Sequence, residues 1–376
     1  MDLFEPGHNP VNGERVRQGR EARGLTQSAL ADAIGVDQTM IAHIERGSKQ
    51  PTGELLRAIA AELGFPPTFF QQTTGPDLPQ GTFLFRAKAG IGKRTIAQAH
   101  AHAELAFEII HKLSRRAKLL PVRIPYHSDP VEGARLVRKQ VNAPPGPISS
   151  LLRVVETLGV LIVPLPPSDD CDAFAAMAGA NRDMPVIGIS TGRSSDRLRM
   201  NVAHELGHIV LHRDAGGGTP TLEREAYQFA AELLIPANDI ESDFAAEKLS
   251  LFRLAELKAK WNASMQAIAR RARELQVIND RQYRYIMQQI SARGWRPVEP
   301  EYGHHLPERP RALRKIVEVV FGESAAVETV ASELKLSPDF VGNLLLQYAS
   351  APGKAKDATQ HRSTSKVIVM SQRPRR

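Results

Sequence analysis

The chain has 376 residues, enough for two or three domains at roughly 100–200 residues each, and its 42% hydrophobic and 24% charged residues are ordinary for a globular protein. A single cysteine excludes an intramolecular disulfide, and the absence of a signal-peptide pattern or of about 18 consecutive apolar residues predicts a cytoplasmic protein that does not enter a membrane. The net charge of +8 is compatible with a nucleic-acid partner.

Residues 12–70 are predicted to form short helices separated by glycines. Thr26 is placed to cap a helix that begins directly after it, and Gly35 is placed to end that helix in a tight turn. Between these two residues, Leu30 and Ala31 fall on the face that would pack against a core. The pattern predicts a first short helix over about eight residues.

A second short helix is predicted over residues 37–47. Ile41 and Ile44 lie three residues apart and would pack inward. The polar residues of the same helix then face outward, at the end that enters a major groove in helix-turn-helix proteins. These outward residues are Gln38, Thr39 and His43. Glutamine suits a bidentate contact to adenine and threonine can contact a thymine methyl group, so this helix is predicted to read base pairs.

These two helices resemble the XRE (Cro/repressor-like) family over about residues 12–65. The resemblance is carried by the run 25–35 (LTQSALADAIG) and by the run 41–51 (IAHIERGSKQP). It implies double-stranded DNA as a partner. The DNA-contacting residues that it implies are Gln27, Gln38, Thr39, His43 and Arg46.

The charge of this N-terminal region leaves an alternative open. Residues 1–75 hold seven basic and nine acidic residues, so few cations are available for phosphates. Arg17, Arg46 and Lys49 would have to make those contacts. The alternative is a helical module of the same shape that binds protein instead of DNA.

A linker is predicted over residues 71–85, which are polar and rich in proline and glycine. It predicts that the units on either side fold separately and move relative to one another. A long helix is then expected over 95–118. The stretch 86–118 holds eight basic and two acidic residues, and 353–376 holds seven and one, so we expect both to strengthen DNA binding through counterion release.

Alternating strand and helix patterns follow. One strand is predicted at 160–163, ended by Pro164, and another at 186–189, which either presents an edge to an extended peptide or lies inside the sheet. Cys171, before a further strand, is interpreted as inert packing. Helices are predicted at 148–158, 197–212, 222–234, 250–260, 263–276 and, after a proline-rich hinge at 297–310, within 311–348.

A candidate metal site lies on a strongly apolar helix. His204 and His208 are four residues apart, just over one helical turn, so both imidazoles project from one face. Glu205 adjoins the first histidine, where a carboxylate can act as general base toward water in an open coordination position. Gly207 leaves the same face thin enough for another element to approach. The next helix carries acidic residues that would complete a His₂Glu zinc site.

Two segments together resemble the ImmA/IrrE metallopeptidase family, over about residues 100–240. They are 204–212 (HELGHIVLH) and 223–236, which occur in the family's order. Members of this family are gluzincin-like zinc peptidases. They commonly act beside, or fused to, XRE-type repressors, and some inactivate the repressor by cutting it. The resemblance implies Zn²⁺, or Mn²⁺ in its place, and a protein substrate that is a repressor.

The resemblance also implies the third ligand. The family's ligand is a glutamate ahead of an A-N-x-F-A run, which corresponds to Glu223. Tyr227 stands where the family has asparagine, so Glu225 is kept as the alternative ligand. Glu232 is interpreted as a solvated charge. His212 either contacts the site or is structural.

The predicted fold is multidomain and mainly α, with an all-α helix-turn-helix domain, a central α+β zincin-like (gluzincin) domain and a small C-terminal helical module. The predicted division is 1–75 for the DNA-binding domain, 76–95 for the linker, 96–290 for the metallopeptidase domain, 291–350 for the helical module and 351–376 for a disordered basic tail. We expect a zinc-dependent endopeptidase, with Glu205 as catalytic base and His204, His208 and Glu223 as ligands, that cleaves a repressor in trans in preference to its own linker. The alternative is a transcription factor whose metallopeptidase-like domain only senses a ligand or partner. An oligomer is compatible with either function.

Overall fold

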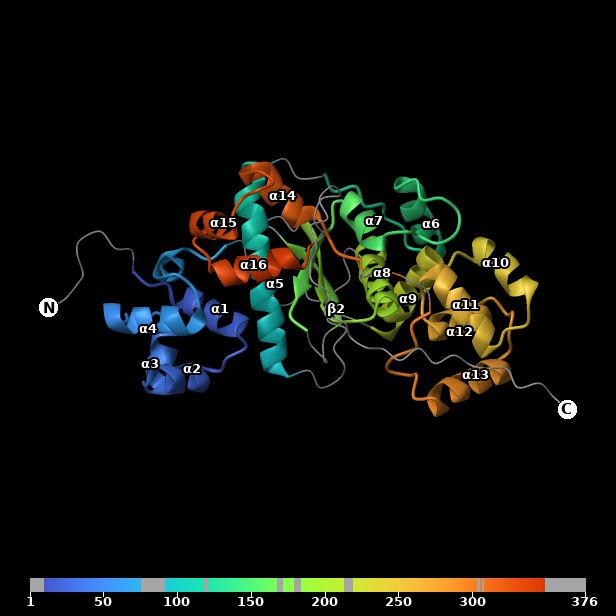
Figure 1. Cartoon of the computed structure of the whole chain (residues 1–376), viewed down its shortest axis with the longest axis horizontal. Helices are drawn as coiled ribbons and strands as arrows, with labels where there is room; N and C mark the ends of the chain where they lie inside the picture. Colours follow the sequence, from blue (N-terminus) through green and yellow to red (C-terminus); the bar gives the residue numbers. More distant parts are fainter. Residues whose placement is uncertain are drawn as a thin grey trace.

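The computed structural model describes residues 10–75, 92–117, 121–167, 172–178, 184–212, 219–302, 305 and 308–348. Within these residues the chain is mostly helical with one small sheet, which confirms the predicted fold class (Figure 1). Among the described helices, none combines the length and the apolar character that crossing a bilayer requires. Cys171, most of the predicted linker and the predicted basic tail lie outside the described residues.

The N-terminal helices begin and end at the caps that the sequence predicted. The Thr26 side chain accepts a hydrogen bond from the backbone N–H of Ala29 at 3.0 Å, and Gly35 ends the helix in a left-handed conformation with φ of 70°. The four apolar residues expected to face the core are all buried: Leu30, Ala31, Ile41 and Ile44. The elements are α1 (Gly13–Ala22), α2 (Gln27–Ile34), α3 (Gln38–Glu45), α4 (Gly53–Leu63) and the 3₁₀ helix η1 (Pro67–Gln71).

The sheet has three strands, β1 (Leu161–Leu165), β2 (Ala173–Ala178) and β3 (Met184–Ser190), in the order β1-β3-β2. β3 pairs in parallel with β1 and antiparallel with β2. The strand predicted at 186–189 is therefore internal, and of its two interpretations the peptide-binding edge is wrong. Both sides of β3 are already hydrogen-bonded, so its backbone has no edge to offer.

The predicted end of the first strand at Pro164 is also wrong. β1 continues through Pro164 to Leu165, and Pro164 stands opposite Ile189 of β3. Proline cannot donate a ladder hydrogen bond, but β1 is an edge strand of this sheet. An edge strand tolerates proline where the missing N–H would point away from its neighbour.

The sheet separates two hydrophobic cores. Alternate residues of a strand point to opposite faces, and here Val163 belongs to one core while Ile162 belongs to the other. The first core contains the N-terminal helices, α5 (Lys93–Ser114) and the C-terminal helices. The second contains the two helices that precede β1 and the helices that follow β3 up to the C-terminal helices, including the one that carries the histidine motif. Figure 1 shows α5 on one side of the strands and α7 (Leu151–Thr157) and α8 (Ser195–Leu211) on the other.

The position of α5 corrects the predicted organisation. Its first residue, Lys93, lies inside the predicted linker at 76–95, and its buried face joins the core of the N-terminal helices. We expected this helix to belong with the metallopeptidase residues and the N-terminal unit to move apart from them. The buried face of an amphipathic helix shows that it packs but does not show against what, so periodicity left its partner undetermined.

The helices of the second core include several that were not predicted. α6 (Pro130–Gln140) begins at the sequence Asp129-Pro130, where the Asp129 side chain accepts hydrogen bonds from two backbone N–H groups. α13 (Asp280–Ala292) begins with a capping box formed by Asn279 and Gln282. The other helices are α9 (Pro220–Leu234), α10 (Ala237–Ala246), which was also missed, α11 (Leu251–Trp261) and α12 (Met265–Glu274).

The C-terminal module consists of α14 (Ala312–Phe321), α15 (Val327–Leu334) and α16 (Pro338–Leu346), in agreement with the helical region predicted within 311–348. Lys335 is left-handed, with φ of 55°, and Ser337 caps α16. The module is fastened to the sheet, because the buried Tyr348 hydroxyl donates a hydrogen bond of 2.8 Å to the carbonyl of Ile162. Burial raises the pKa of Tyr348 well above its usual value, so the hydroxyl keeps its proton.

Candidate metal centre and DNA-binding face

The candidate metal centre is built between α8 and α9, which cross closely at Gly207. A Cβ atom on Gly207 would lie 3.0 Å from Cδ1 of Phe229 and 3.2 Å from the Cα and carbonyl oxygen of Ala226. The absence of a side chain therefore lets the backbone of α9 approach the histidine face of α8, as the sequence suggested. This approach brings Glu223, in the first turn of α9, opposite the two histidines.

Three side chains converge at this crossing. The Nε2 atoms of His204 and His208 are 3.1 Å apart, and the two carboxylate oxygens of Glu223 lie 3.2 Å from His204 Nε2 and 3.4 Å from His208 Nε2. A tetrahedral ion with bonds of about 2.0–2.1 Å separates its ligand atoms by about 3.3 Å. The separations are close to this length, the two to Glu223 involving its two different carboxylate oxygens. Among the described residues these three form the group that could hold a metal, with one ligand atom of each within 4.8 Å of the others.

The two histidines are buried and the glutamate is partly exposed. His204 and His208 are 0% and 2% exposed, whereas the Glu223 side chain is 31% exposed. Glu205, the predicted base, is also buried, and it adjoins His204 in the chain. Access from solvent to the three-residue group is therefore on the side of Glu223.

Glu225 contacts a different histidine from Glu223. Its carboxylate accepts a hydrogen bond from His212 Nε2 at 2.9 Å, and His212 Nδ1 lies 3.2 Å from His208 Nδ1. Only one of these two Nδ1 atoms can carry the shared proton. If His212 donates from Nε2 to Glu225, its Nδ1 accepts the proton of His208 Nδ1, which leaves His208 Nε2 as a lone pair directed at the three-residue group.

Two further residues of α9 have contacts that the sequence did not predict: Tyr227, which stands where the family has asparagine, and Glu232, which was interpreted as a solvated charge. Tyr227 packs edge-on against the ring of His204, with centroids 4.6 Å apart, and the guanidinium of Arg270 lies 4.8 Å from the Tyr227 centroid. Glu232 is not a solvated charge. It is buried, forms an ion pair with Arg271 and accepts a hydrogen bond from the Ala237 N–H at 3.3 Å. The pattern showed only a polar residue on an exposed-looking face, because its cationic partner comes from α12.

The predicted DNA-contacting residues lie together on α2, α3 and the residue that follows α3. Gln38, Thr39, His43 and Arg46 are exposed, and Gln27 is half-buried. Gln27 donates to Glu45 at 2.7 Å and accepts from Gln38 at 3.2 Å, so the two amides are fixed relative to each other. The Nδ1 of His43 lies 2.9 Å from the Ser48 hydroxyl. This arrangement presents amide and hydroxyl groups on one face, which suits base contacts in a major groove.

Comparison with known proteins gives matches in both regions. A family model described as the IrrE N-terminal-like domain matches residues 155–273, and a helix-turn-helix family model matches residues 16–70. The curated protein YazB of Bacillus subtilis (strain 168), an uncharacterized HTH-type transcriptional regulator, is 33% identical over 51 residues, which are 14% of this chain and 74% of the relative. The crystal structure of Bacillus thuringiensis PlcR in complex with the peptide PapR7 and DNA is 14% identical, covering 74% of this chain and 92% of that chain, with a TM-score of 0.15, too low to compare the folds.

Proposed function

Because the chain belongs to the XRE-type helix-turn-helix family through its N-terminal helices and carries an IrrE-like peptidase-family domain behind them, we propose that it is a zinc-dependent endopeptidase coupled to a sequence-specific DNA-binding domain. Its proposed substrate is a transcriptional repressor. The observation that supports the peptidase most strongly is the convergence of His204, His208 and Glu223, which each bring a ligand atom within 4.8 Å of the other two.

In this proposal His204, His208 and Glu223 hold Zn²⁺, or Mn²⁺ in its place. The ion supplies Lewis acidity, which polarises a peptide carbonyl and lowers the pKa of water. Glu205 accepts the proton of the attacking water and delivers it to the departing amine as the C–N bond breaks. Glu205 is buried and adjoins His204 in the chain, which places its carboxylate beside the proposed ligands.

The test separates metal binding from cleavage. Purified protein should bind about one zinc ion per chain, and His204→Ala or His208→Ala should lose it. Glu205→Gln should keep the zinc but lose zinc-dependent cleavage of repressors encoded near the gene, as followed by intact-mass spectrometry. The matched control is Glu241→Gln on α10, which is exposed and should leave both properties unchanged.

The outcomes also decide between enzyme and sensor. Zinc binding with no cleavage of any candidate repressor, and identical behaviour of wild type and Glu205→Gln, would favour a transcription factor whose metallopeptidase-like domain senses a ligand or partner. Loss of zinc from Glu205→Gln would instead contradict the assigned roles, because a base that does not touch the ion should not be needed to hold it.

A further inference from the structure

The N-terminal helices are fixed against α5 along much of its length. The Nε2 of His102 lies 2.9 Å from the carbonyl of Ala22, and the Gln98 side chain covers Gly24, where a Cβ atom would lie 3.0 Å from it. Further along the helix, the buried Arg15 and Glu108 form an ion pair with a separation of 2.6 Å. α5 therefore has a defined position relative to the helices that carry the predicted DNA contacts.

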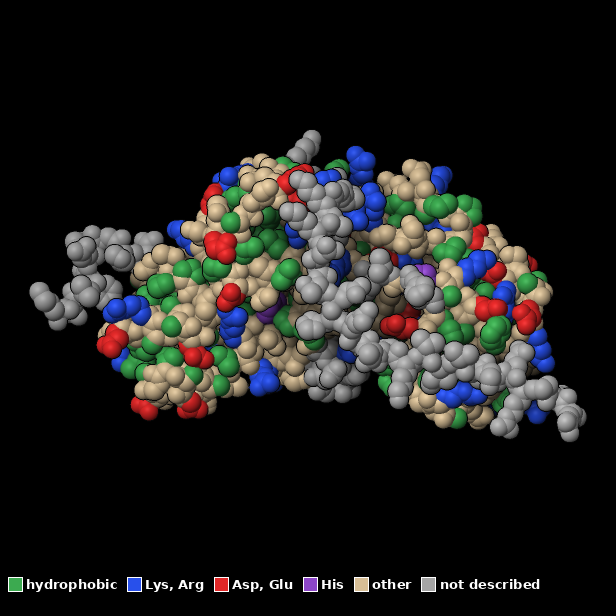
Figure 2. All heavy atoms as spheres, in the orientation of Figure 1, with side chains coloured by type: hydrophobic (Ala, Val, Ile, Leu, Met, Phe, Trp, Pro, Cys, Tyr) green, Lys and Arg blue, Asp and Glu red, His purple; other side chains and the backbone are tan. Residues whose placement is uncertain are grey.

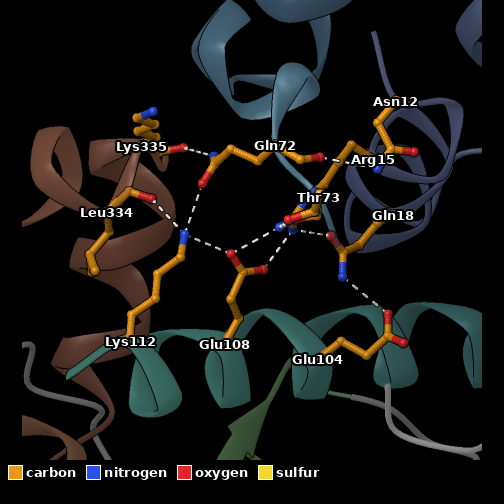
Figure 3. Close-up of polar contacts among 10 residues, drawn as sticks. All are labelled: Asn12, Arg15, Gln18, Gln72, Thr73, Glu104, Glu108, Lys112, Leu334 and Lys335. Atoms are coloured by element: carbon orange, nitrogen blue, oxygen red, sulfur yellow. Dashed lines mark hydrogen bonds and ion pairs between the residues drawn. The ribbon is translucent and has the colours of Figure 1, made fainter. Parts of the chain in front are cut away.

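The same contacts extend to the C-terminal module. Figure 3 shows Glu108 between Arg15 on one side and Lys112 on the other, with Gln72 above them. Lys112 Nζ also donates to Gln72 Oε1 at 2.9 Å and to the carbonyl of Leu334 at 3.2 Å. The C-terminal end of α5 thus contacts both α15 and Gln72, which follows η1.

Two buried arginines of the N-terminal unit are held in ion pairs within the molecule, and a third arginine is hydrogen-bonded within the unit. Arg15 pairs with Glu108, Arg20 with Glu45 at 2.6 Å, and the exposed Arg23 donates to the carbonyl of Leu63 at 2.7 Å. The exposed cations directly after α3 are Arg46, whose Nε donates to the carbonyl of Ala42 at 3.1 Å, and Lys49. In Figure 2 the visible face of this unit carries basic and acidic side chains interspersed, without a continuous basic area.

The first turn of α5 places two positive charges beside the helices that carry the predicted DNA contacts. A cavity of about 480 Å³ lies beside α3, the helix predicted to read base pairs. Its lining includes Gln27, Ser28 and Gln38 from the N-terminal helices and Lys93 and Arg94 from α5. Lys93 and Arg94 are exposed and form no ion pair with a described residue. Glu21 also lines the cavity, but its carboxylate already contacts Arg20 at 3.5 Å. Figure 1 shows this end of α5 level with α2 and α3.

We propose that the DNA-binding surface continues from the helix-turn-helix onto the first turn of α5, where Lys93 and Arg94 bind the phosphates that flank the bases facing Gln38. This inference rests on the proposed DNA-binding function and adds a second structural unit to the interface. Phosphate contacts position a reading helix without specifying sequence. Lys93 and Arg94 would therefore raise affinity for all duplexes, while Gln38 governs preference among them.

The basic residues at the other end of α5 are excluded from this surface. Lys112 is held by Glu108, Gln72 and Leu334, and Arg116 pairs with Glu333 and lies over the ring of Phe321. The excess of positive charge over the segment 86–118 had suggested that the whole stretch assists DNA binding. The contacts of Lys112 and Arg116 therefore favour the first turn of α5 for that role.

The test compares two double substitutions in the full-length chain. Lys93→Ala/Arg94→Ala should weaken binding to a labelled random-sequence duplex of about 30 base pairs by about tenfold near 0.1 M salt, and should reduce the slope of log affinity against log salt by about 1 to 2. The matched control is Arg281→Ala/Arg284→Ala. It removes the same charge from exposed positions on α13, at the opposite end of the molecule in Figure 1, and should leave the slope unchanged.

Each result decides one question. If both double variants lose affinity equally, or if Lys93→Ala/Arg94→Ala keeps the wild-type slope, the extension onto α5 is wrong while DNA binding itself stands. If the wild-type chain binds no duplex at low salt, the DNA-binding function is wrong and the extension falls with it. Circular dichroism of both double variants checks that a lost affinity does not reflect unfolding.

Discussion

Two glutamates at the beginning of α9 contact different histidines because of their spacing in the helix. Glu223 and Glu225 are two residues apart, so on a helix their side chains point about 200° apart. Glu223 accordingly lies 3.2 Å from His204, whereas Glu225 lies 2.9 Å from His212. The geometry thus favours Glu223 as the proposed ligand and gives Glu225 the role of orienting a ligand through His212.

The first prediction separates these two roles. Glu223→Ala should lose stoichiometric zinc, because only two ligand side chains would remain. Glu225→Ala and His212→Ala should still bind one zinc ion per chain, with affinity lowered by about 10–100-fold, because partners behind a ligand tune its orientation and basicity. Competition with a fluorescent chelator measures both effects. Full zinc affinity in Glu223→Ala together with loss of zinc in Glu225→Ala would reverse the assignment.

At the scale of elements, the metal centre depends on the closeness of α8 and α9. Phe229 and Ala226 occupy the space in which any side chain at position 207 would lie. Two of the three proposed ligands are on α8 and the third is on α9. A small outward movement of α9 therefore carries Glu223 away from both histidines at once and loosens the packing of Phe229 and Leu233 in the second core.

The second prediction tests this closeness with Gly207→Val. The added carbons should force α9 outward, destabilise the fold by about 1–3 kcal/mol through overpacking, and lower zinc affinity further than the loss of stability explains. Chemical denaturation and zinc titration measure the two effects. The control is Gly53→Val in α4, where nothing lies within 4 Å of the added Cβ, and which should leave zinc affinity unchanged. Zinc affinity unchanged in Gly207→Val would show that α9 tolerates the displacement.

The sequence predicted those parts of the site that lie within one helix. The spacing of His204 and His208 follows from 3.6 residues per turn, and the absence of a side chain at Gly207 is visible in the sequence itself. A partner from another element was out of reach of such reasoning, as Arg271 beside Glu232 illustrates. The choice between Glu223 and Glu225 needed the resemblance to a family, because both are acidic residues at the start of the same helix.

Helices with strong local sequence signals were predicted correctly. Features that depend on which element packs against which were missed. α2 is marked by its caps and α8 by its run of apolar residues, and both are found close to the expected bounds. α6 and α13 carry cap signals too, Asp129 before Pro130 and Asn279 with Gln282, and attention to those signals would have found them. The partner of α5 had no local signal at all, since its buried face fits any apolar surface of the right size.

At the scale of the whole molecule, the N-terminal unit, α5, the sheet and α8 form successive layers. α5 packs against α1 on one side and against β1 on another, and the opposite face of the sheet packs against α8. The unit that carries the predicted DNA contacts is therefore connected to the helix that carries the proposed ligands through α5 and the sheet. The composition of 71–85 predicts units that fold separately and move; in this structure the N-terminal helices and α5 share one hydrophobic core.

The contact between the N-terminal unit and α5 depends on the ionised carboxylate of Glu108. Burial alone would raise the pKa of Glu108, but the hydrogen bonds and charges of Arg15 and Lys112 outweigh it and hold the pKa below its usual value. A carboxyl whose pKa is lowered on folding stabilises the folded state above its unfolded pKa, and this contribution is lost as the pH falls through the lowered pKa. The contact is therefore fully formed at neutral pH.

The same contact bears on whether the enzyme cuts itself. A peptidase binds its substrate as an extended chain, so the segment to be cut must leave its surroundings. Gln72 and Thr73, at the start of the predicted linker, are fixed by hydrogen bonds that their backbone carbonyls accept. Asn12 donates to the carbonyl of Gln72 at 3.0 Å and Arg15 donates to that of Thr73, while the Gln72 side chain donates to the carbonyl of Lys335 at 3.4 Å.

The third prediction follows from these bonds and favours cleavage of a partner in trans. At neutral pH, wild-type protein incubated with Zn²⁺ should give no zinc-dependent N-terminal fragment of about 75–85 residues, while a repressor substrate is shortened. Glu108→Ala should release Gln72 and Thr73 by leaving Arg15 buried without its partner, at a cost of about 3–5 kcal/mol. The control Glu333→Ala removes an exposed carboxylate that contacts only Arg116 and should release neither. A fragment from the wild type that is absent in Glu205→Gln would establish self-cleavage. A fragment confined to Glu108→Ala would show that docking on α5 protects the chain from its own active site.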